Sequence, residues 1–314
     1  MKKPPLLLTD DLPPLLPTCV HYAGTARYIE KALELQRGAG EKFDICCDLE
    51  DGAVVGEERK LLQSFIEIIA ARTPAEGRIG VRVHPIASRL WEEEIDHLIK
   101  KVGRCLGFIV LPKAANAEEV SKVLRWIAAR SKAQKLKKPV PLQVIIESRS
   151  AVADVRAIAA LDSVETLDFG LLDFISDHGG VIPEECMHSP AQFEHRIVAR
   201  AKDEIVAASL LHSKVPAHNV CINLKTTAQV FEDALRARQK FGFLRMWSIH
   251  PAQIEPIQRA MRPDFSKLAE ARDILEQAEA AKWAPIRFNE RLYDRASYRS
   301  CYELVRRAGF YGVR

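Results

Sequence analysis

The sequence predicts an α/β fold, a closed (β/α)8 TIM barrel with a C-terminal helical extension. Two observations predict it: eight short apolar runs recur along the chain, and segments with helical periodicity separate them. The runs are apolar throughout, which is typical of parallel strands that are buried on both faces. A doubly wound open sheet is the alternative, but eight evenly spaced units favour closure.

The predicted strands are short apolar runs, and several end at glycine, proline or charged residues. In chain order they span residues 18–22, 43–49, 79–84, 106–111, 142–148, 167–174, 219–223 and 244–249. The first, second, fourth and eighth end at Ala23-Gly24, Glu50-Asp51-Gly52, Pro112-Lys113 and His250-Pro251. The helices between them have apolar residues at helical spacing, and Gly38 closes the first. They span residues 26–36, 57–71, 91–101, 117–129, 151–160, 191–213 and 227–241.

Both ends of the chain lie outside the predicted barrel. Residues 1–17 include five prolines, which predict an irregular N-terminal arm. Residues 18–262 then form the catalytic barrel domain. Residues 263–314 form a helical lid or oligomerisation segment, with helices over 265–282 and 297–308.

The composition argues against several classes of function. The 314 residues are 47% hydrophobic, and 46 basic against 42 acidic residues give a net charge of +4, which does not indicate a nucleic-acid binder. No apolar run reaches the roughly 18 residues that a membrane span needs. The stretch Met1–Pro5 is too proline-rich to begin a signal peptide. The seven cysteines form no CxxC pair and no zinc-ligand spacing, so we expect free thiols and a cytoplasmic protein.

Two acids organise the predicted site. Glu147 and Asp173 stand near the ends of the fifth and sixth apolar runs, and the helical segment 151–160 joins the runs. A strand–helix–strand unit makes parallel neighbours, so both carboxylates converge on one crevice. A hard cation such as Mg²⁺ would relieve their repulsion. The alternative is that each acid caps a helix or pairs with a nearby arginine.

Further polar side chains follow the apolar runs, where a barrel carries its active site. They are Asp48, Glu50, Asp51, Arg82, His84, Lys113, Asn223 and His250. The acids at 48–51 either cap a helix or divide two tasks, holding Arg82 and supporting a metal through its water. Arg82 stays charged inside an apolar run, so it either forms a structural ion pair with Asp48 or Glu50, or stabilises a developing enolate. His250 is either a base or a structural strand-end histidine, and no motif supports a Cys or Ser nucleophile.

Several of these residues stand in motifs that resemble the HpcH/HpaI aldolase and citrate-lyase β-subunit family, in particular its acyl-CoA lyase branch. The matching motifs are Asp48-Leu49-Glu50-Asp51 with Lys60 downstream, Val81-Arg82-Val83, Leu111-Pro112-Lys113, Ile146-Glu147, Phe169–Phe174 and Ser248–Pro251. They follow the family's order from about residue 18 to 260. The tail Leu292–Tyr298 is similar to the C-terminal lid segment of malyl-CoA and citramalyl-CoA lyases.

The resemblance implies a Mg²⁺-dependent carbon–carbon lyase that cleaves a 3-hydroxyacyl-CoA into an acyl-CoA and a 2-oxo acid. It implies metal binding by Glu147 and Asp173 and contact of Arg82 with the substrate's carboxylate and keto oxygen. Asp294 is implied in proton transfer at a neighbouring subunit's site, within a homotrimer or hexamer. The predicted catalytic residues are therefore Arg82, Asp294, Glu50 and Asp48, and the predicted substrate contacts are Arg82, Glu147, Lys113 and His250.

Departures from the family pattern keep two other functions open. Tyr22-Ala23-Gly24 and Ala114-Ala115-Asn116 stand where the family tends to have a proline-containing turn and an acid, and Asn219 replaces a common aspartate. One alternative is an aldolase that acts on free 2-oxo acids without CoA. The other is a citrate lyase β-like subunit that needs an acyl-carrier partner, or a CoA-ester binder that has lost its activity.

Overall fold

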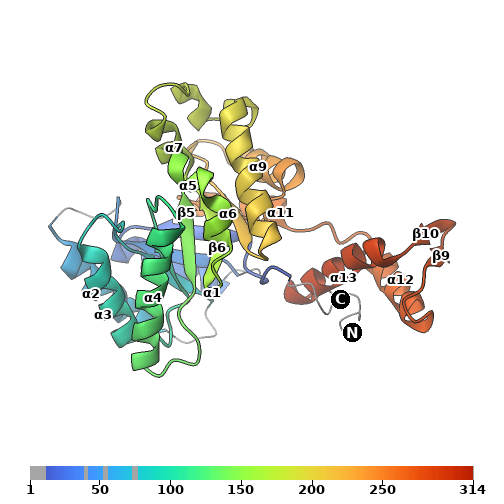
Figure 1. The fold of residues 1–314 in the computed structure, drawn as a ribbon, viewed down its shortest axis with the longest axis horizontal. Helices are drawn as coiled ribbons and strands as arrows, with labels where there is room; N and C mark the ends of the chain where they lie inside the picture. The colour runs from blue at the N-terminus through green and yellow to red at the C-terminus, as the bar shows by residue number, and fades with distance from the viewer. Residues whose placement is uncertain (1–11, 39–41, 52–55, 73–76, 314) are drawn as a thin grey trace. The chain divides into compact units, whose positions relative to one another are not determined.

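Eight parallel strands close into a barrel in which each strand pairs with the next and β8 pairs with β1 (Figure 1). The structure, a computed structural model, describes residues 12–38, 42–51, 56–72 and 77–313. The strands are β1 (Cys19–Ala23), β2 (Asp44–Asp48), β3 (Ile79–Arg82), β4 (Phe108–Leu111), β5 (Leu142–Ile146), β6 (Val164–Phe169), β7 (Val215–His218) and β8 (Arg245–Ser248). This confirms the predicted (β/α)8 fold.

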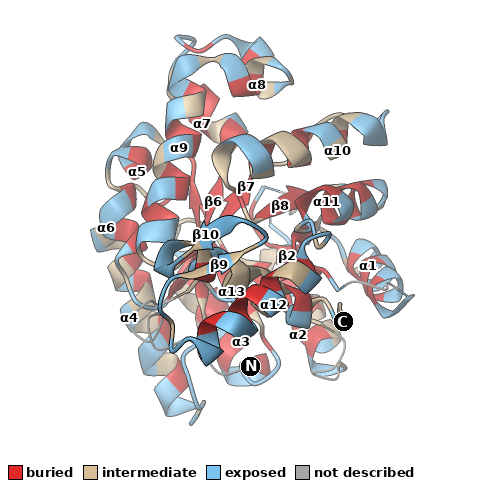
Figure 2. Ribbon diagram, turned by 90° about the vertical axis from the view of Figure 1, so that its right-hand side faces the viewer, coloured by how far each residue is buried: buried red, intermediate tan, exposed pale blue. Residues whose placement is uncertain are grey.

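Helices surround the strands and bury their apolar faces against them. In Figure 2 the strands β6, β7 and β8 are buried, whereas the helices around them expose their outer faces. The helices of the barrel are α1 (Ala26–Gly38), α2 (Glu58–Ala70), α3 (Leu90–Val102), α4 (Ala117–Ala133), α5 (Arg149–Ala153), α6 (Val155–Ala159), α7 (Leu171–Asp177), α8 (Ala191–Glu194), α9 (Arg196–Leu211), α10 (Thr227–Arg236) and α11 (Ile254–Met261). Among the described residues, no helix combines the length and the apolar character that crossing a membrane requires.

The barrel interior is packed solid beneath its carboxyl end. Side chains from six strands form an inner apolar cluster: Val20, Cys46, Phe108, Val110, Ile145, Ala217 and Trp247. The Phe108 ring lies 2.2 Å from where a Cβ at Gly80 would stand, so only glycine fits there. Alternate strand residues therefore fill the barrel, and the residues after the strands are left to form a site.

The predicted seventh strand, residues 219–223, is wrong. The strand is β7, four residues earlier, and the apolar run Val220-Cys221-Ile222 is a loop at its carboxyl end. Pro216 argues against a strand at the level of sequence, because proline has no N–H to donate to a neighbouring strand. Its carbonyl still accepts from the Leu244 N–H at 3.1 Å, which keeps Pro216 within the barrel.

Three predicted segments are divided in the structure. The run 167–174 ends as a strand at Phe169, and α7 begins after Gly170, so Asp173 lies on a helix rather than at a strand end. The predicted helix 151–160 breaks at Asp154, whose carboxylate accepts from the Ala117 N–H at 2.6 Å. The predicted helix 191–213 breaks at His195, whose ψ of 120° is not helical.

The chain divides into two compact units, Leu16–Met261 and a second one that joins Arg262–Arg314 to the N-terminal residues. The second unit contains α12 (Leu268–Ala280), a hairpin of β9 (Ile286–Phe288) and β10 (Arg291–Tyr293), and α13 (Arg295–Phe310). Tyr298 is fully buried against Ile274 and Leu275. Residues 1–11 of the predicted arm, and Gly52 after the second strand, lie outside the described residues.

All seven cysteines are free thiols, as expected from their spacing. Five of them are buried, Cys105 is exposed and Cys301 is partly buried.

Candidate active site

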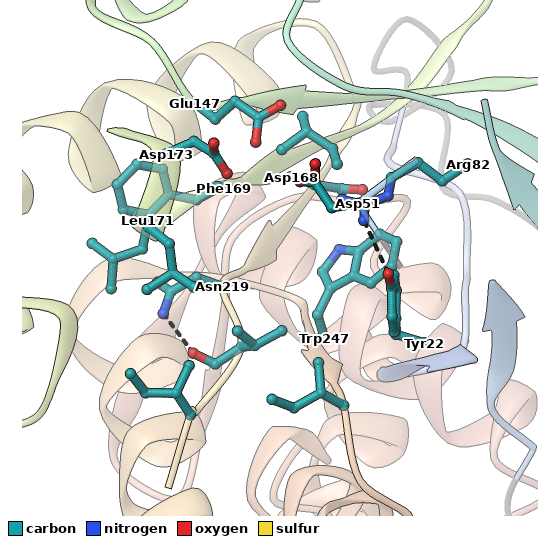
Figure 3. A pocket seen from close by; sticks show the side chains of 16 residues that line it. Tyr22, Asp51, Arg82, Glu147, Asp168, Phe169, Leu171, Asp173, Asn219 and Trp247 are labelled. Atoms are coloured by element: carbon teal, nitrogen blue, oxygen red, sulfur yellow. Dashed lines mark hydrogen bonds between the residues drawn. The ribbon is translucent and has the colours of Figure 1, made fainter. Parts of the chain in front are cut away.

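A pocket of about 280 Å³ opens at the carboxyl ends of the barrel strands (Figure 3). Its lining comes from β1, β3, β5, β6 and β8, from the start of α7, and from the segments that follow β2, β5, β7 and β8. Its polar members are Tyr22, Asp51, Arg82, Glu147, Asp168, Asp173, Asn219 and Trp247. An apolar hollow with a few convergent polar groups is the usual form of a small-molecule site.

Arg82 is held in a fixed orientation on one side of the pocket. The β2–β3 register places Asp48 directly beside it, and the Arg82 Nε donates to Asp48 Oδ1 at 2.6 Å. Arg82 Nη2 donates to the Tyr22 hydroxyl at 3.1 Å, and that hydroxyl donates to the other Asp48 oxygen. Arg82 Nη1 lies 3.2 Å from Glu50 Oε2. The ion pair predicted with Asp48 or Glu50 is therefore formed with both, and Arg82 still lines the pocket.

This pairing keeps Arg82 charged although it is largely buried. Burial acts to lower the pKa of Arg82, but the hydrogen bond and charge of Asp48 outweigh it and raise that pKa well above its ordinary value. Burial likewise raises the pKa of Tyr22, so its hydroxyl keeps its proton. The result is a fixed positive charge at the pocket wall.

Glu147 follows β5, and its side chain packs against the backbone of Gly170. A Cβ at Gly170 would stand 2.4 Å from the Glu147 Cβ and 2.6 Å from its Oε2, so the missing side chain makes room for this carboxylate. The Lys113 backbone N–H donates to Glu147 Oε1 at 2.5 Å. Burial and the negative charge of Asp173 raise the pKa of Glu147 to about 8.

Asp173 reaches the same pocket from the first turn of α7. Figure 3 shows the Glu147 and Asp173 carboxylates near one another on the same side of the pocket. The predicted convergence of the two acids is therefore present, although Asp173 comes from a helix. Its charge acts on Glu147, and that repulsion is the feature that a bound cation would relieve.

The acid pair fits a magnesium ion better than a softer metal. Within the described parts of the chain, no three His, Cys, Asp or Glu side chains gather as a metal cluster. Two carboxylates suit Mg²⁺, which commonly binds through one or two protein carboxylates and fills its other positions with water and substrate oxygens. The space at Gly170 accommodates the Glu147 carboxylate, and Asp173 lines the same pocket, so the residues present fit such an ion.

Lys113 and Glu50 support the pocket from its side. The Lys113 ammonium lies 2.5 Å from Glu50 Oε1 and 3.1 Å from Asp51 Oδ1. Glu50 therefore bridges Lys113 and Arg82, and Lys113 holds Glu147 through its main chain. Lys113 has a φ of 51°, in the left-handed region that favours glycine, and its N–H and its ammonium have different partners.

Of the predicted catalytic and substrate-contact residues, the two that remain cap helices. His250 is exposed, and its Nδ1 accepts from the Ala252 N–H at 3.2 Å. Asp294 lies in the C-terminal unit at the N-terminus of α13, where its carboxylate accepts from the Ala296 N–H at 3.0 Å in a capping box. Two other candidates have local partners: His84 Nδ1 lies 2.5 Å from Glu94 Oε1, and Asn223 Oδ1 accepts from the Lys225 N–H at 2.9 Å. The structure thus brings together Asp48, Glu50, Arg82, Glu147 and Asp173, and gives His250 and Asp294 local roles.

Four polar residues of the pocket are not among the site residues predicted from the sequence: Tyr22, Asp168, Asn219 and Trp247. Asp168 carried a usable signal, because an acid inside an otherwise apolar run needs polar surroundings, and here it lines the pocket. Asn219 was assigned to the start of a strand and instead follows one. Tyr22 and Trp247 look like ordinary core residues in sequence.

A closed (β/α)8 barrel with charged groups gathered at the carboxyl ends of its strands defines the class of barrel enzymes. Comparison of sequences then gives the family. Residues 36–239 match the family model of HpcH/HpaI aldolase/citrate lyase, and the chain belongs to this family.

Known proteins resemble the chain over most of its length. The L-malyl-CoA/beta-methylmalyl-CoA lyase of Cereibacter sphaeroides is 28% identical over 274 residues, which cover 83% of this chain and 86% of the relative. The crystal structure of a citrate lyase from Burkholderia xenovorans LB400 has 40% identity and a TM-score of 0.87, covering 96% and 94% of the two chains. Protein CitE of Mycobacterium tuberculosis, in complex with magnesium, acetoacetate and coenzyme A, shares the fold at 19% identity and a TM-score of 0.68, covering 94% and 98%.

Proposed function

We propose that the protein is a Mg²⁺-dependent carbon–carbon lyase that cleaves a 3-hydroxyacyl-CoA of the malyl or citramalyl type into an acyl-CoA and a 2-oxo acid. The observation that carries the proposal is the pair of interacting carboxylates, Glu147 and Asp173, in one pocket with the charged Arg82. The malyl-CoA lyase relative and the magnesium and coenzyme A bound to the Mycobacterium tuberculosis neighbour support it.

Glu147 and Asp173 would hold the cation. When bound there, Mg²⁺ supplies positive charge that polarises the carbonyl of the 2-oxo acid. Gly170 and the Lys113 backbone keep the Glu147 carboxylate in place for this task.

Arg82 would stabilise the negative charge that moves during the reaction. The C3 hydroxyl loses its proton, the C2–C3 bond breaks, and its electron pair leaves with C2 as the enolate of the acyl thioester. A proton added at C2 then completes the acyl-CoA product. Asp48, Tyr22 and Glu50 hold the guanidinium before the substrate arrives, so no reorganisation is needed when charge develops.

The remaining roles follow from position and from family membership. Lys113 and His250 would contact the substrate from the rim. Asp294 would deliver or accept a proton at the site of a neighbouring subunit, with the C-terminal unit as a lid in a homotrimer or hexamer. A carboxylate that caps α13 is already fixed in orientation, which suits a group that transfers a proton.

The test is to mix purified protein with Mg²⁺ and a panel of 3-hydroxyacyl-CoA esters and to measure release of a 2-oxo acid. We expect release that stops when the metal is chelated and returns when Mg²⁺ is restored. No product from any ester would contradict the proposal.

A second candidate is a citrate lyase β-like subunit that acts on an acyl-carrier thioester, which the 40% identical citrate lyase favours. Isolated protein would then bind Mg²⁺ and thioester without turnover, and an acyl carrier would restore activity. A CoA-independent aldolase is separated from both by thermal shift, because it would not respond to CoA or acetyl-CoA.

A further inference from the structure

Two residues of the pocket have buried acceptor atoms without a close hydrogen-bond partner within the described part of the chain. These atoms are both oxygens of Asp168 and Oδ1 of Asn219. Thr166 and Trp247 stand near enough to Asp168 to lower its pKa, so a donor from a ligand would join them at this carboxylate. Asp168 and Asn219 are 1% and 3% exposed, and both line the pocket, Asp168 from β6 and Asn219 from the position directly after β7. Buried polar atoms are nearly always satisfied, so unpaired ones that face a cavity indicate a ligand.

Asp168 lies one layer deeper in the barrel than the acid pair. The β5–β6 register places it beside Ile145, two residues before Glu147. Ile145 and Trp247 belong to the inner apolar cluster that closes the barrel below the pocket. Asp168 is therefore on the floor, whereas Glu147 lies nearer the mouth.

The amide of Asn219 can point only one way. Its Nδ2 donates to Gln192 Oε1 at 3.1 Å and to the Val220 carbonyl at 2.9 Å. Gln192 Oε1 also accepts from the buried Lys202 amine at 2.9 Å, and Gln192 Nε2 donates to Ser189 Oγ at 3.0 Å. A flipped Asn219 would set two carbonyl oxygens against each other.

A chain of directed hydrogen bonds fixes Gln192 in turn. Ser189 Oγ donates to Asp233 Oδ1 at 2.5 Å, so it can only accept from Gln192 Nε2. His218 Nδ1 lies 3.1 Å from the Asn219 carbonyl and must donate to it, which leaves Nε2 to accept from Lys202 at 2.9 Å. The donors of Ser189, Gln192, His218 and Asn219 are therefore all used within this network. The Asn219 Oδ1 is left to accept a hydrogen bond from a molecule in the pocket.

The shape of the proposed substrate decides which of its groups lies beside the oxygens of Asp168 and Asn219. In the proposed reaction C3 carries the hydroxyl, a carboxylate, the acyl-CoA arm and a fourth substituent. Coenzyme A is far larger than a pocket of about 280 Å³, so its arm must leave through the mouth. The carboxylate and hydroxyl belong beside Arg82 and the acid pair. At a tetrahedral carbon the fourth substituent then points to the floor.

We infer that this fourth substituent carries a hydrogen-bond donor, a hydroxymethyl or similar hydroxyalkyl group, which Asp168 and Asn219 accept. The inference rests on the proposed lyase function and names its substrate class. The 2-oxo acid released is then a hydroxylated one, rather than glyoxylate or pyruvate. A second carboxylate on this substituent is disfavoured, because at the floor it would meet the carboxyl group of Asp168, and two carboxylates side by side repel each other.

Binding of 2-oxo acids tests the inference without turnover. Calorimetry in Mg²⁺ compares hydroxypyruvate with pyruvate, which differ by one hydroxyl, and with oxaloacetate and glyoxylate. We expect hydroxypyruvate to bind at least about tenfold more tightly than pyruvate, since a site built for a hydroxyl rejects the analogue that lacks it. Equal affinities, or tighter binding of oxaloacetate or glyoxylate, would overturn the inference.

Three variants test whether Asp168 and Asn219 cause the preference for hydroxypyruvate over pyruvate. Asp168→Leu removes both acceptor oxygens and should reduce the preference to about onefold, whereas Asp168→Asn keeps one oxygen and should retain most of it. Gln192→Leu leaves the pocket lining unchanged but frees the Asn219 amide to turn, so the preference should fall severalfold. A preference that survives Asp168→Leu would overturn the inference. The charge of Arg245 acts on Asp168, but Arg245 keeps its own ion pair with Asp44 when Asp168 is replaced, so Asp168→Leu should fold.

The same measurements separate this inference from the proposed function. If hydroxypyruvate is preferred in binding but no CoA ester is cleaved, the floor is as inferred and the lyase proposal fails. If CoA esters are cleaved but hydroxypyruvate and pyruvate bind equally, the lyase proposal stands and the inference fails.

Discussion

The Glu147 carboxylate lies where a side chain at Gly170 would begin, with Oε2 only 2.6 Å from the position of a Cβ there. Gly170→Ala should therefore push Glu147 out of place and weaken Mg²⁺ binding by tenfold or more. We expect a loss of stability of about 1–3 kcal/mol as well, because overpacking forces neighbours to shift. Calorimetric titration of Mg²⁺ and thermal unfolding measure the two effects.

Gly309→Ala is the matched control for this change. Gly309 lies in α13, and a Cβ there would meet nothing within 4 Å. This variant should bind Mg²⁺ as the parent does and gain up to about 1 kcal/mol from the better helix former. Equal Mg²⁺ affinity in the two alanine variants would contradict a metal role for Glu147.

Arg82→Lys should abolish most activity while leaving the charge in place. Lysine cannot contact Asp48, Glu50 and Tyr22 at once, so the positive charge would no longer be fixed where negative charge develops. We expect kcat to fall by roughly 10²–10³, the cost of removing one such donor. Arg59→Lys, at an exposed ion pair with Glu93, should leave kcat unchanged. A kcat for Arg82→Lys near that of the parent would show that Arg82 is structural.

The residues of this site differ in how far sequence could predict them. Arg82, Glu147 and Asp48 follow or end apolar runs, so the strand rhythm alone placed them together. Asp173 also lines the pocket, but not from the end of a strand as predicted. The strand ends before Gly170, and Asp173 lies in the first turn of α7. The role of Asn219 depends on Gln192, a residue distant in sequence, and no local pattern carries that information.

The pH dependence of stability should reveal the buried Asp168. Burial raises the pKa of Asp168 from 3.8 to about 7, although Thr166, Arg245 and Trp247 act to lower it. Between these values the unfolded chain has released the proton and the folded chain has not, so stability falls as pH rises from about 4 to about 7. The difference amounts to at most about 4 kcal/mol.

Asp168→Asn removes this titration, so its stability relative to the parent should increase over the same pH range. Urea unfolding at several pH values measures the difference. Asp177→Asn is a control of opposite sign, because hydrogen bonds from Arg149 lower the pKa of Asp177, so its contribution is lost as pH falls. A constant difference between Asp168→Asn and the parent from pH 4 to 7 would contradict a raised pKa.

Asp294 offers a way to separate helix capping from catalysis. Serine is as good an N-cap as aspartate, so Asp294→Ser should keep α13 and the melting temperature while it removes the carboxylate. If Asp294 transfers a proton, kcat should fall by about 10²–10⁴. Asp294→Ala should lose about 1 kcal/mol of stability in addition. Full activity of Asp294→Ser would leave this residue as a cap alone.

Mixing two strongly impaired variants tests whether Asp294 acts on a neighbouring subunit. Arg82→Lys protein has an intact Asp294, and Asp294→Ser protein has an intact Arg82. If each active site combines Arg82 of one subunit with Asp294 of another, mixed oligomers contain some complete sites, because one subunit can supply each intact residue. Activity should then appear after the two proteins are unfolded and refolded together, and it should depend on the mixing ratio. Separate refolding of each variant is the control and should give only its residual activity. If both residues serve the site of their own chain, every mixed site lacks one of them and the mixture stays at this residual level.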